Sequence, residues 1–402
     1  MQLIDVTSFI KTHITGRKES LFAHDIARHQ QLLFENIHKK RVLVIGGAGT
    51  IGSSYIKAIL PFQPASLTVV DYSENELTEL TRDLRSDTKM VVPSHYITYP
   101  FDFGSPIFEK LIRKQPFDIV ACFAAHKHVR SEKDHLAIEA MINNNVFNTQ
   151  KLLETLLPMP PQHIFSVSTD KAANPVNVMG ASKKLMEKVL MAYSTEMQIT
   201  TARFANVAFS NGSLLYGFLQ RMMKRQPLSS PADVRRYFVS PLESGELCML
   251  ASLLGDSGDI FFPKLGQDQM LTFAEIAERF LAEIGLVPDY CTSEQEAKEK
   301  AAVWENDQST YPVYFFTSDT SGEKMYEEFY DESDVLDLNS FEQLGIVKSR
   351  NAPSIDKIHL LIEEFKSLFS GDISKDNIIS LLNKHLPDFS HIETGKSLDA
   401  KM

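Results

Sequence analysis

The chain has 402 residues, of which 43% are hydrophobic and 23% charged, as in an ordinary globular protein large enough for two or three structural units. Its net charge of −11 argues against a general nucleic-acid binder, because neutralising phosphates requires a basic surface. Any anionic ligand must therefore be bound by a local group of basic residues.

The three cysteines, Cys122, Cys248 and Cys291, are far apart and lack CxxC spacing. They predict neither a disulfide framework nor a zinc site, so we expect no metal and a reducing, cytoplasmic location. No apolar run approaches the length of about 18 residues typical of a membrane-spanning helix. The first residues also lack the layout of a signal peptide, so neither membrane insertion nor secretion is expected.

A helical arm is predicted over residues 1–40, followed by a candidate nucleotide-binding turn. A short apolar strand over residues 42–45 runs into a GxxGxxG turn and then into a helix. The glycines permit a tight turn, close approach of a pyrophosphate and close packing of helix on strand, and the helix start offers unpaired N–H groups to phosphates. The cofactor contacts predicted here are Gly46, Gly49, Thr50, Ile51 and Gly52.

Asp71 ends the second predicted strand. An acid at this position can accept hydrogen bonds from both ribose hydroxyls of NAD and repels the additional phosphate of NADP. We therefore expect NAD, with NADP disfavoured. The alternative is that Asp71 caps a turn and that another residue contacts the cofactor.

The third and fourth predicted strands end in further candidate ligand contacts. The third ends in an acid and an aromatic residue, where an adenine could lie, and the fourth in small residues that permit close approach of a ligand: Asp102, Phe103, Ala124 and Ala125. The following His126-Lys127-His128 could be read as a metal site. Because no acid or cysteine lies nearby, phosphate or sugar contact by Lys127 and His128 is favoured instead.

Residues 163–184 contain the densest group of reactive side chains. An apolar strand leads directly into Thr169, Asp170 and Lys171, and the helical pattern that follows places Met179 and Lys183 on one face. Because parallel sheets bind ligands at the carboxyl ends of their strands, we predict an active site here. Taken singly, these residues could instead be a turn cap, a solvated ion pair and a surface lysine.

The recurring strand–helix–strand pattern, continued by a strand over 199–207, predicts an α/β fold with a doubly wound parallel sheet of the Rossmann type and flanking helices. We assign residues 41–207 to this NAD-binding domain, with a return segment near 235–262. Residues 208–345 are assigned to a smaller C-terminal substrate-binding lobe, in which 289–312 looks like a polar insertion. A helical tail is predicted over 346–402, and apolar helical faces there and on the NAD-binding domain suggest a homo-oligomer.

Basic residues gather locally within the predicted lobe. Arg235 and Arg236 precede an aromatic residue, and Lys264 ends a short strand. Such a group is what a diphosphate ligand needs in an acidic protein. For each residue taken singly, solvated surface charge is the alternative.

These motifs resemble the extended short-chain dehydrogenase/reductase superfamily, and within it the capsule and O-antigen polysaccharide-biosynthesis proteins that act as UDP-N-acetylglucosamine 4,6-dehydratases. Most of the superfamily has a tyrosine where Met179 stands, and the resemblance is to the subgroup with methionine there. The chain has Asn211 and Thr320 where the family often has arginine. The resemblance is carried by residues 46–52, 127–129, 168–183, 203–207 and 322–324.

The resemblance implies a hydro-lyase with an internally recycled cofactor. NAD takes hydride from C4 of a UDP-sugar, water is lost across C5 and C6, and the hydride returns to C6. Lys171 is the expected base at C5, Asp170 the acid for the C6 hydroxyl, Thr169 a partner of the 4-hydroxyl, and Lys183 a partner of the nicotinamide ribose. Either Asp170 or water relayed through Lys183 would remove the 4-hydroxyl proton.

Two further expectations follow from these roles. For Lys171 to act as a base near neutrality, its pKa must fall by roughly three units from about 10.4, which burial and the charge of Lys183 could provide. The substrate contacts are expected at Lys127, His128, Asn174, Met179, Asn206, Ser213, Arg236 and Lys264, and Asn206 is also expected to contact the cofactor.

Two other functions stay open. A UDP-sugar 4-epimerase shares the oxidation at C4 but needs no acid at C6, so Asp170 and Lys171 argue against it. A regulatory or scaffold protein with an inactive site would explain the missing tyrosine, and it would retain NAD without turning over any UDP-sugar.

Overall fold

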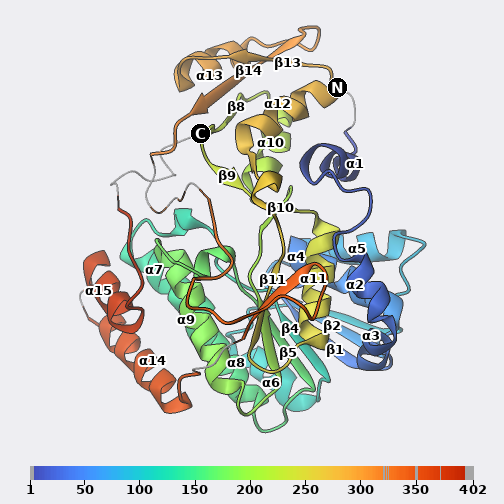
Figure 1. Cartoon of the computed structure of the whole chain (residues 1–402), viewed down its shortest axis with the longest axis vertical. Coiled ribbons are helices and arrows are strands. Elements are labelled where there is room, and N and C mark those ends of the chain that lie inside the picture. Colours follow the sequence, from blue (N-terminus) through green and yellow to red (C-terminus); the bar gives the residue numbers. More distant parts are fainter. Residues whose placement is uncertain are drawn as a thin grey trace.

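A computed structural model describes residues 4–319, 322, 324, 326–348, 352–371 and 373–393 (Figure 1). Thr320 and residue 323 of the motif at 322–324 lie outside the described residues. A large α/β unit carries a smaller lobe on one side, and the N-terminal and C-terminal helices pack around this pair (Figure 1).

The α/β unit is built on a nine-stranded sheet in the order β15-β16-β11-β6-β5-β4-β1-β2-β3. Seven neighbouring strands are parallel, and β16 and β15 extend the edge in antiparallel pairing. The predicted doubly wound parallel sheet is therefore confirmed. The strands are β1 (Arg41–Ile45), β2 (Ser66–Asp71), β3 (His95–Pro100), β4 (Ile119–Cys122), β5 (His163–Val167), β6 (Ile199–Ala202), β11 (Asp259–Pro263), β15 (Leu336–Asp337) and β16 (Leu344–Lys348).

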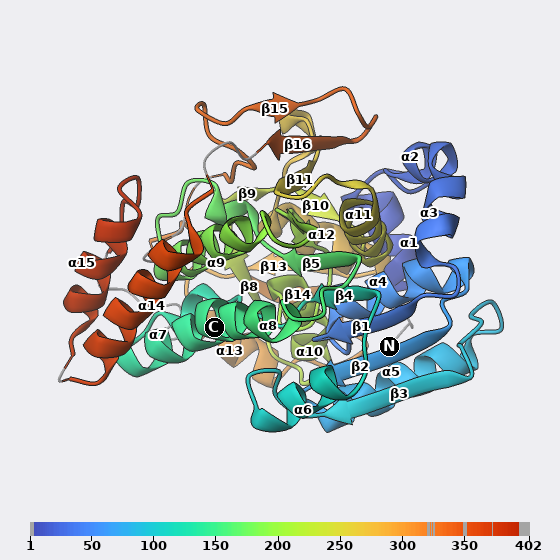
Figure 2. The same ribbon diagram turned by 90° about the horizontal axis from the view of Figure 1, so that it is seen from below.

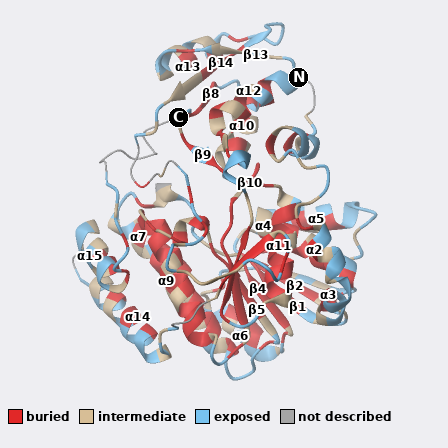
Figure 3. Cartoon of the chain, in the orientation of Figure 1, coloured by how far each residue is buried: buried red, intermediate tan, exposed pale blue. Residues whose placement is uncertain are grey.

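Helices cover both faces of this sheet, as the view of the molecule from below shows (Figure 2). The central strands are almost wholly buried, which agrees with their continuous apolar runs in the sequence, whereas the edge strand β3 is partly exposed (Figure 3). One face carries α4 (Thr50–Ile59) and α11 (Pro241–Leu254), and the other carries α6 (Pro106–Lys114), α8 (Asn148–Leu156) and α9 (Val178–Tyr193).

The smaller lobe has its own apolar core around Phe218, Phe280 and Tyr311. Residues 289–312, read from the sequence as a polar insertion, form part of its sheet and bury Ala297, Ala301 and Trp304. The lobe contains β8 (Leu228–Pro231), β13 (Val287–Tyr290), β14 (Thr310–Phe316), α10 (Leu214–Met223), α12 (Phe273–Glu283) and α13 (Glu294–Ala302). Strands β15 and β16 instead extend the main sheet, although residues 336–345 were predicted to belong to the lobe and residues 346–348 to the helical tail.

The N-terminal arm packs on both units. The ring of Phe9, at the end of α1 (Val6–Phe9), contacts Phe280 of the lobe with ring centroids 5.8 Å apart. The helices α2 (Ala23–Arg28) and α3 (Gln30–Ile37) lie beside the main sheet instead (Figure 2). The arm therefore spans the boundary between the lobe and the α/β unit.

The C-terminal tail forms α14 (Ile355–Phe369) and α15 (Lys375–His385), which pack beside α9 and α7 (His135–Ile142). The apolar face of α14, including Ile358, Leu361 and Phe365, is buried within the chain. The tail face that suggested self-association is thus covered internally. None of the described helices combines the length and the apolar character that crossing a membrane requires.

Candidate active site

A cavity of about 710 Å³ lies between the carboxyl edge of the main sheet and the lobe. It collects side chains from β5, α9, the turn after β1 and the segments that enter the lobe. Predicted site residues on its wall are Ile51, Ala125, Lys127, His128, Thr169, Asp170, Lys171, Met179, Lys183, Asn206, Ser213 and Arg236.

The residues after β5 form one hydrogen-bonded group around the carboxylate of Asp170. Its Oδ1 accepts hydrogen bonds from the Thr169 hydroxyl at 2.9 Å, the Lys171 backbone N–H at 2.9 Å and the Lys171 ammonium at 3.1 Å. A one-turn 3₁₀ helix, Asp170–Ala172, produces this convergence by turning the chain back at the strand end. A hydroxyl, an acid and an amine are thereby held together on the cavity wall.

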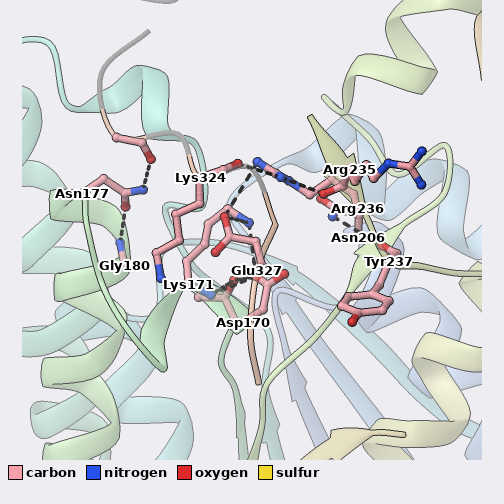
Figure 4. A network of polar contacts seen from close by, with 12 residues as sticks. Asp170, Lys171, Asn177, Gly180, Asn206, Arg235, Arg236, Tyr237, Lys324 and Glu327 are labelled. Carbon is pink, nitrogen blue, oxygen red and sulfur yellow. Dashed lines mark hydrogen bonds and ion pairs between the residues drawn. The ribbon is translucent and has the colours of Figure 1, made fainter. Parts of the chain in front are cut away.

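Glu327 completes this group and was not predicted from the sequence. Its carboxylate lies 3.5 Å from the Lys171 ammonium and 3.8 Å from the guanidinium of Arg236, and all three side chains point toward one another (Figure 4). Glu327 is only 5% exposed. The sequence offered no signal beyond the neighbouring motif at 322–324, because an acidic stretch is ordinarily a solvated surface.

The charge state of Lys171 differs from the expected one. Burial lowers its pKa, but the nearby carboxylates of Asp170 and Glu327 outweigh burial, so the net shift of its pKa is upward. Burial likewise raises the pKa of Glu327, although Lys171 opposes that shift. The expectation that the pKa of Lys171 is lowered by the charge of Lys183 is therefore wrong for this structure.

Lys183, unlike Lys171, has a lowered pKa. It is 4% exposed, and burial lowers the pKa of its ammonium to about 8. Its Nζ donates to the carbonyl of Val167 at 2.6 Å, which ties α9 to the end of β5. A lysine at this position is therefore able to change protonation state near neutral pH.

The glycine turn after β1 has the geometry that the sequence predicted for phosphate binding. Gly46 has a φ of +70°, and a Cβ atom there would lie 2.5 Å from the backbone nitrogen of Ala124. Within the described ranges, no side chain caps the start of α4 at Gly49. The first N–H groups of this helix, beside Ile51 on the cavity wall, suit an anionic group such as the pyrophosphate of NAD.

Asp71 lies beside this turn with both carboxylate oxygens in use. One accepts from the backbone N–H of Ala48 at 3.1 Å and the other from Ser73 at 3.0 Å. The turn-capping alternative is thus present in the structure. Each carboxylate oxygen of Asp71 still has a lone pair that could accept a further hydrogen bond. Contact between Asp71 and the ribose of NAD therefore stays a prediction.

Several predicted residues do not join the cavity wall. Phe103 is buried against Phe108 in the core, Asp102 accepts from the Gly104 N–H, and Asn174 donates to Glu328 at 3.0 Å. Lys264 donates to the carbonyls of Leu338 and Phe341 and supports the loop before β16. The structure therefore removes Lys264 from the group expected to bind a diphosphate and leaves Arg236 in it.

A doubly wound sheet, a glycine turn and a lysine on the helix after the fifth strand define an extended short-chain dehydrogenase/reductase. The chain belongs to the family described as polysaccharide biosynthesis protein, whose sequence model matches residues 42–349.

Several known proteins are similar to this chain in sequence. An uncharacterized membrane protein of Methanocaldococcus jannaschii is 29% identical over 78% of this chain and 87% of its own length. The probable polysaccharide biosynthesis protein EpsC of Bacillus subtilis is 28% identical over 90% of this chain, which spans only 58% of EpsC. A UDP-N-acetylglucosamine 4,6-dehydratase (inverting) of Campylobacter jejuni is 27% identical over 56% of this chain and 67% of its own length.

Solved structures share the fold. Pen from Bacillus thuringiensis superposes with a TM-score of 0.63 at 21% identity, covering 88% of this chain and 98% of Pen. DesIV, a dTDP-glucose 4,6-dehydratase from Streptomyces venezuelae, gives a TM-score of 0.55 at 19% identity, covering 72% of this chain and 88% of DesIV.

Proposed function

We propose that the chain is an NAD-dependent nucleotide-sugar 4,6-dehydratase that converts UDP-N-acetylglucosamine to the 4-keto-6-deoxy sugar for surface polysaccharide or glycan synthesis. The observation that carries this proposal is the group formed by Thr169, Asp170 and Lys171 on the cavity wall beside Lys183, with Met179 in place of a tyrosine. Elimination of water requires both a base and an acid at the sugar, and this group supplies both. The dehydratase among the sequence relatives supports the same reaction.

The chain's own residues would divide the proton transfers between them. Asp170 in its carboxylate form takes the 4-hydroxyl proton as C4 is oxidised, and Lys171 in its amine form removes the C5 proton. Asp170, now in its acid form, gives its proton to the C6 hydroxyl, which leaves as water, and the ammonium of Lys171 then returns a proton to C5. Thr169 is placed to contact the 4-hydroxyl, and Arg236 would face the diphosphate. The hydrogen bond from Lys171 to Asp170 holds the proposed base and acid side by side, which supports these roles.

NAD would be held by the glycine turn, the start of α4, Asp71 and Lys183, and when bound it would accept hydride from C4 and return it at C6. The open start of α4 and the close-packed glycines fit its pyrophosphate. The structure of DesIV, which was solved with NAD bound, supports this choice of cofactor.

The decisive experiment is incubation of the purified protein with UDP-N-acetylglucosamine in deuterated water, with and without added NAD, followed by mass spectrometry and proton NMR. We expect loss of one water with one deuterium at C5. The C5 coupling constant then reports retention or inversion. Unchanged UDP-sugars in every case, with NAD retained, would instead favour the regulatory function.

A UDP-sugar 4-epimerase is the second candidate, because a UDP-glucose 4-epimerase of Rickettsia rickettsii is 28% identical over 56% of this chain. In the same experiment an epimerase yields a product of unchanged mass that is inverted at C4. That result would replace the dehydratase proposal.

A further inference from the structure

Glu327 occupies an unusual place behind the candidate active site. Lys171 and Arg236 both line the cavity, and the carboxylate of Glu327 lies within ion-pair distance of both. Glu327 is not on the cavity wall itself, and its side chain is 4% exposed. It therefore reaches the two cations from behind the cavity wall.

We propose that Glu327 is a positioning residue that fixes Lys171 and Arg236 relative to each other and holds Lys171 in its ammonium form. Its importance for catalysis rests on the proposed dehydratase function, whereas its effect on Lys171 does not. Glu327, which the segment after β14 contributes, thereby joins the group of reactive residues after β5.

The charges around Lys171 explain why one carboxylate has so large an effect. Asp170 faces Lys171 from its own segment, Glu327 faces it from the segment after β14, and Arg236 faces it from β9 (Arg235–Arg236). Lys324 also acts on Glu327. In a buried cluster with two carboxylates beside Lys171, loss of either one leaves its ammonium markedly less stabilised.

The backbone around Glu327 is fixed from two directions. Asn177 donates to the carbonyl of Gly322 at 2.8 Å, and Arg236 donates to the carbonyl of Lys324 at 3.0 Å (Figure 4). These contacts anchor the segment to α9 and to β9 without using the Glu327 carboxylate. Replacing that carboxylate by an amide should therefore remove its charge and its ion pairs with Lys171 and Arg236 while leaving the backbone of the segment in place.

The test compares Glu327→Gln with a matched control, Glu328→Gln. Glu328 is the adjacent glutamate, and its carboxylate accepts from Asn174 at the surface. The Lys171 side chain is 19% exposed, so the pH dependence of its acetylation by a small reagent, followed by mass spectrometry of the peptide, reports its apparent pKa. We expect Glu327→Gln to lower this pKa by at least about one unit, so that labelling below the pKa is about tenfold faster.

Two further variants and the C5 exchange reaction serve as controls for the effect of Glu327 on Lys171. Glu328→Gln should leave the labelling curve unchanged. In Glu327→Asp the apparent pKa of Lys171 should lie between its values in Glu327→Gln and in the original protein. This variant also provides the test if Glu327→Gln does not fold. An identical apparent pKa in all proteins would overturn the proposal. If the dehydratase proposal holds, the acid limb of C5 deuterium exchange moves to lower pH in Glu327→Gln. Absence of exchange in the unmodified protein would count against that function alone, because the labelling curve still decides the role of Glu327.

Discussion

The side-chain amide of Asn177 donates a 2.8 Å hydrogen bond to the carbonyl of Gly322, 145 residues further along the chain. The other end of the same amide caps α9, because its Oδ1 accepts from the N–H of Gly180 at 2.7 Å. One buried side chain thus fixes both the helix that carries Lys183 and the segment that leads to Glu327 (Figure 4).

Replacing Asn177 with alanine should lower the free energy of unfolding by about 2–3 kcal/mol, because a helix cap is lost and a buried carbonyl loses its donor. Chemical denaturation measures this change. Asn174→Ala is the control, because within the described part of the chain its amide donates only to the exposed residue Glu328, and it should change stability by less than about 0.5 kcal/mol. Equal effects of the two substitutions would contradict the bridging role.

The turn after β1 gives a second prediction. Gly46→Ala places a Cβ atom 2.5 Å from the Ala124 backbone nitrogen and forces alanine to a φ of +70°, which should cost about 2–5 kcal/mol of stability. Calorimetric titration should show at least about tenfold weaker NAD binding, because the proposed pyrophosphate site is distorted.

The control for this prediction is Gly217→Ala. Gly217 lies in α10, and a Cβ atom there would meet nothing within 4 Å. Because alanine favours helices, this substitution should be neutral or should stabilise the protein by up to about 1 kcal/mol. Unchanged NAD binding by folded Gly46→Ala would remove the turn from the proposed cofactor site.

Local patterns predicted the parts of the molecule that depend on neighbouring residues. The strand, glycine turn and helix after β1, and the reactive residues after β5, follow from short-range periodicity, and the topology of a parallel sheet places their ends together. Lys183 reached the cavity because helical spacing fixes its face relative to Met179.

The errors occurred where long-range packing decides the contacts. Glu327 enters the site because the segment after β14 returns to β5, and Lys264 leaves it because carbonyls of the loop before β16 capture its ammonium. Phe103 could not be distinguished from a ligand-stacking ring by sequence, because a core aromatic has the same pattern. The upward shift of the Lys171 pKa comes from Asp170 and from Glu327, and the contribution of Glu327 was missed for the same reason.

Lys171 itself supplies the third prediction. Lys171→Ala should reduce deuterium exchange at C5 by at least about a hundredfold, because the proposed base is removed. NAD binding should persist, since the turn after β1 is untouched. Lys224→Ala, at the exposed end of α10, is the control for loss of a positive charge. Retained exchange in Lys171→Ala would exclude the lysine as the base at C5.

The buried charge of Lys183 predicts how stability depends on pH. Its pKa falls from 10.5 in an exposed lysine to about 8 in the folded protein. Between these values the unfolded chain binds more protons than the folded one, so stability rises with pH across this window. Below about pH 8 the folded state carries the full penalty of a buried ammonium, which amounts to about 3 kcal/mol and is relieved as the pH approaches 10.5.

Lys183→Met isolates this contribution because methionine has similar length and no charge. The difference in unfolding free energy between variant and original protein, measured by denaturation from about pH 7 to 10, cancels the titration of all other groups. The variant should have its greatest relative stability at the low end of this range, and its advantage should shrink by up to about 3 kcal/mol toward the high end. Loss of the bond to Val167 adds a constant offset to this difference. If the difference in unfolding free energy stays constant with pH, Lys183 keeps an ordinary pKa. That result would exclude Lys183 from relaying protons near neutral pH.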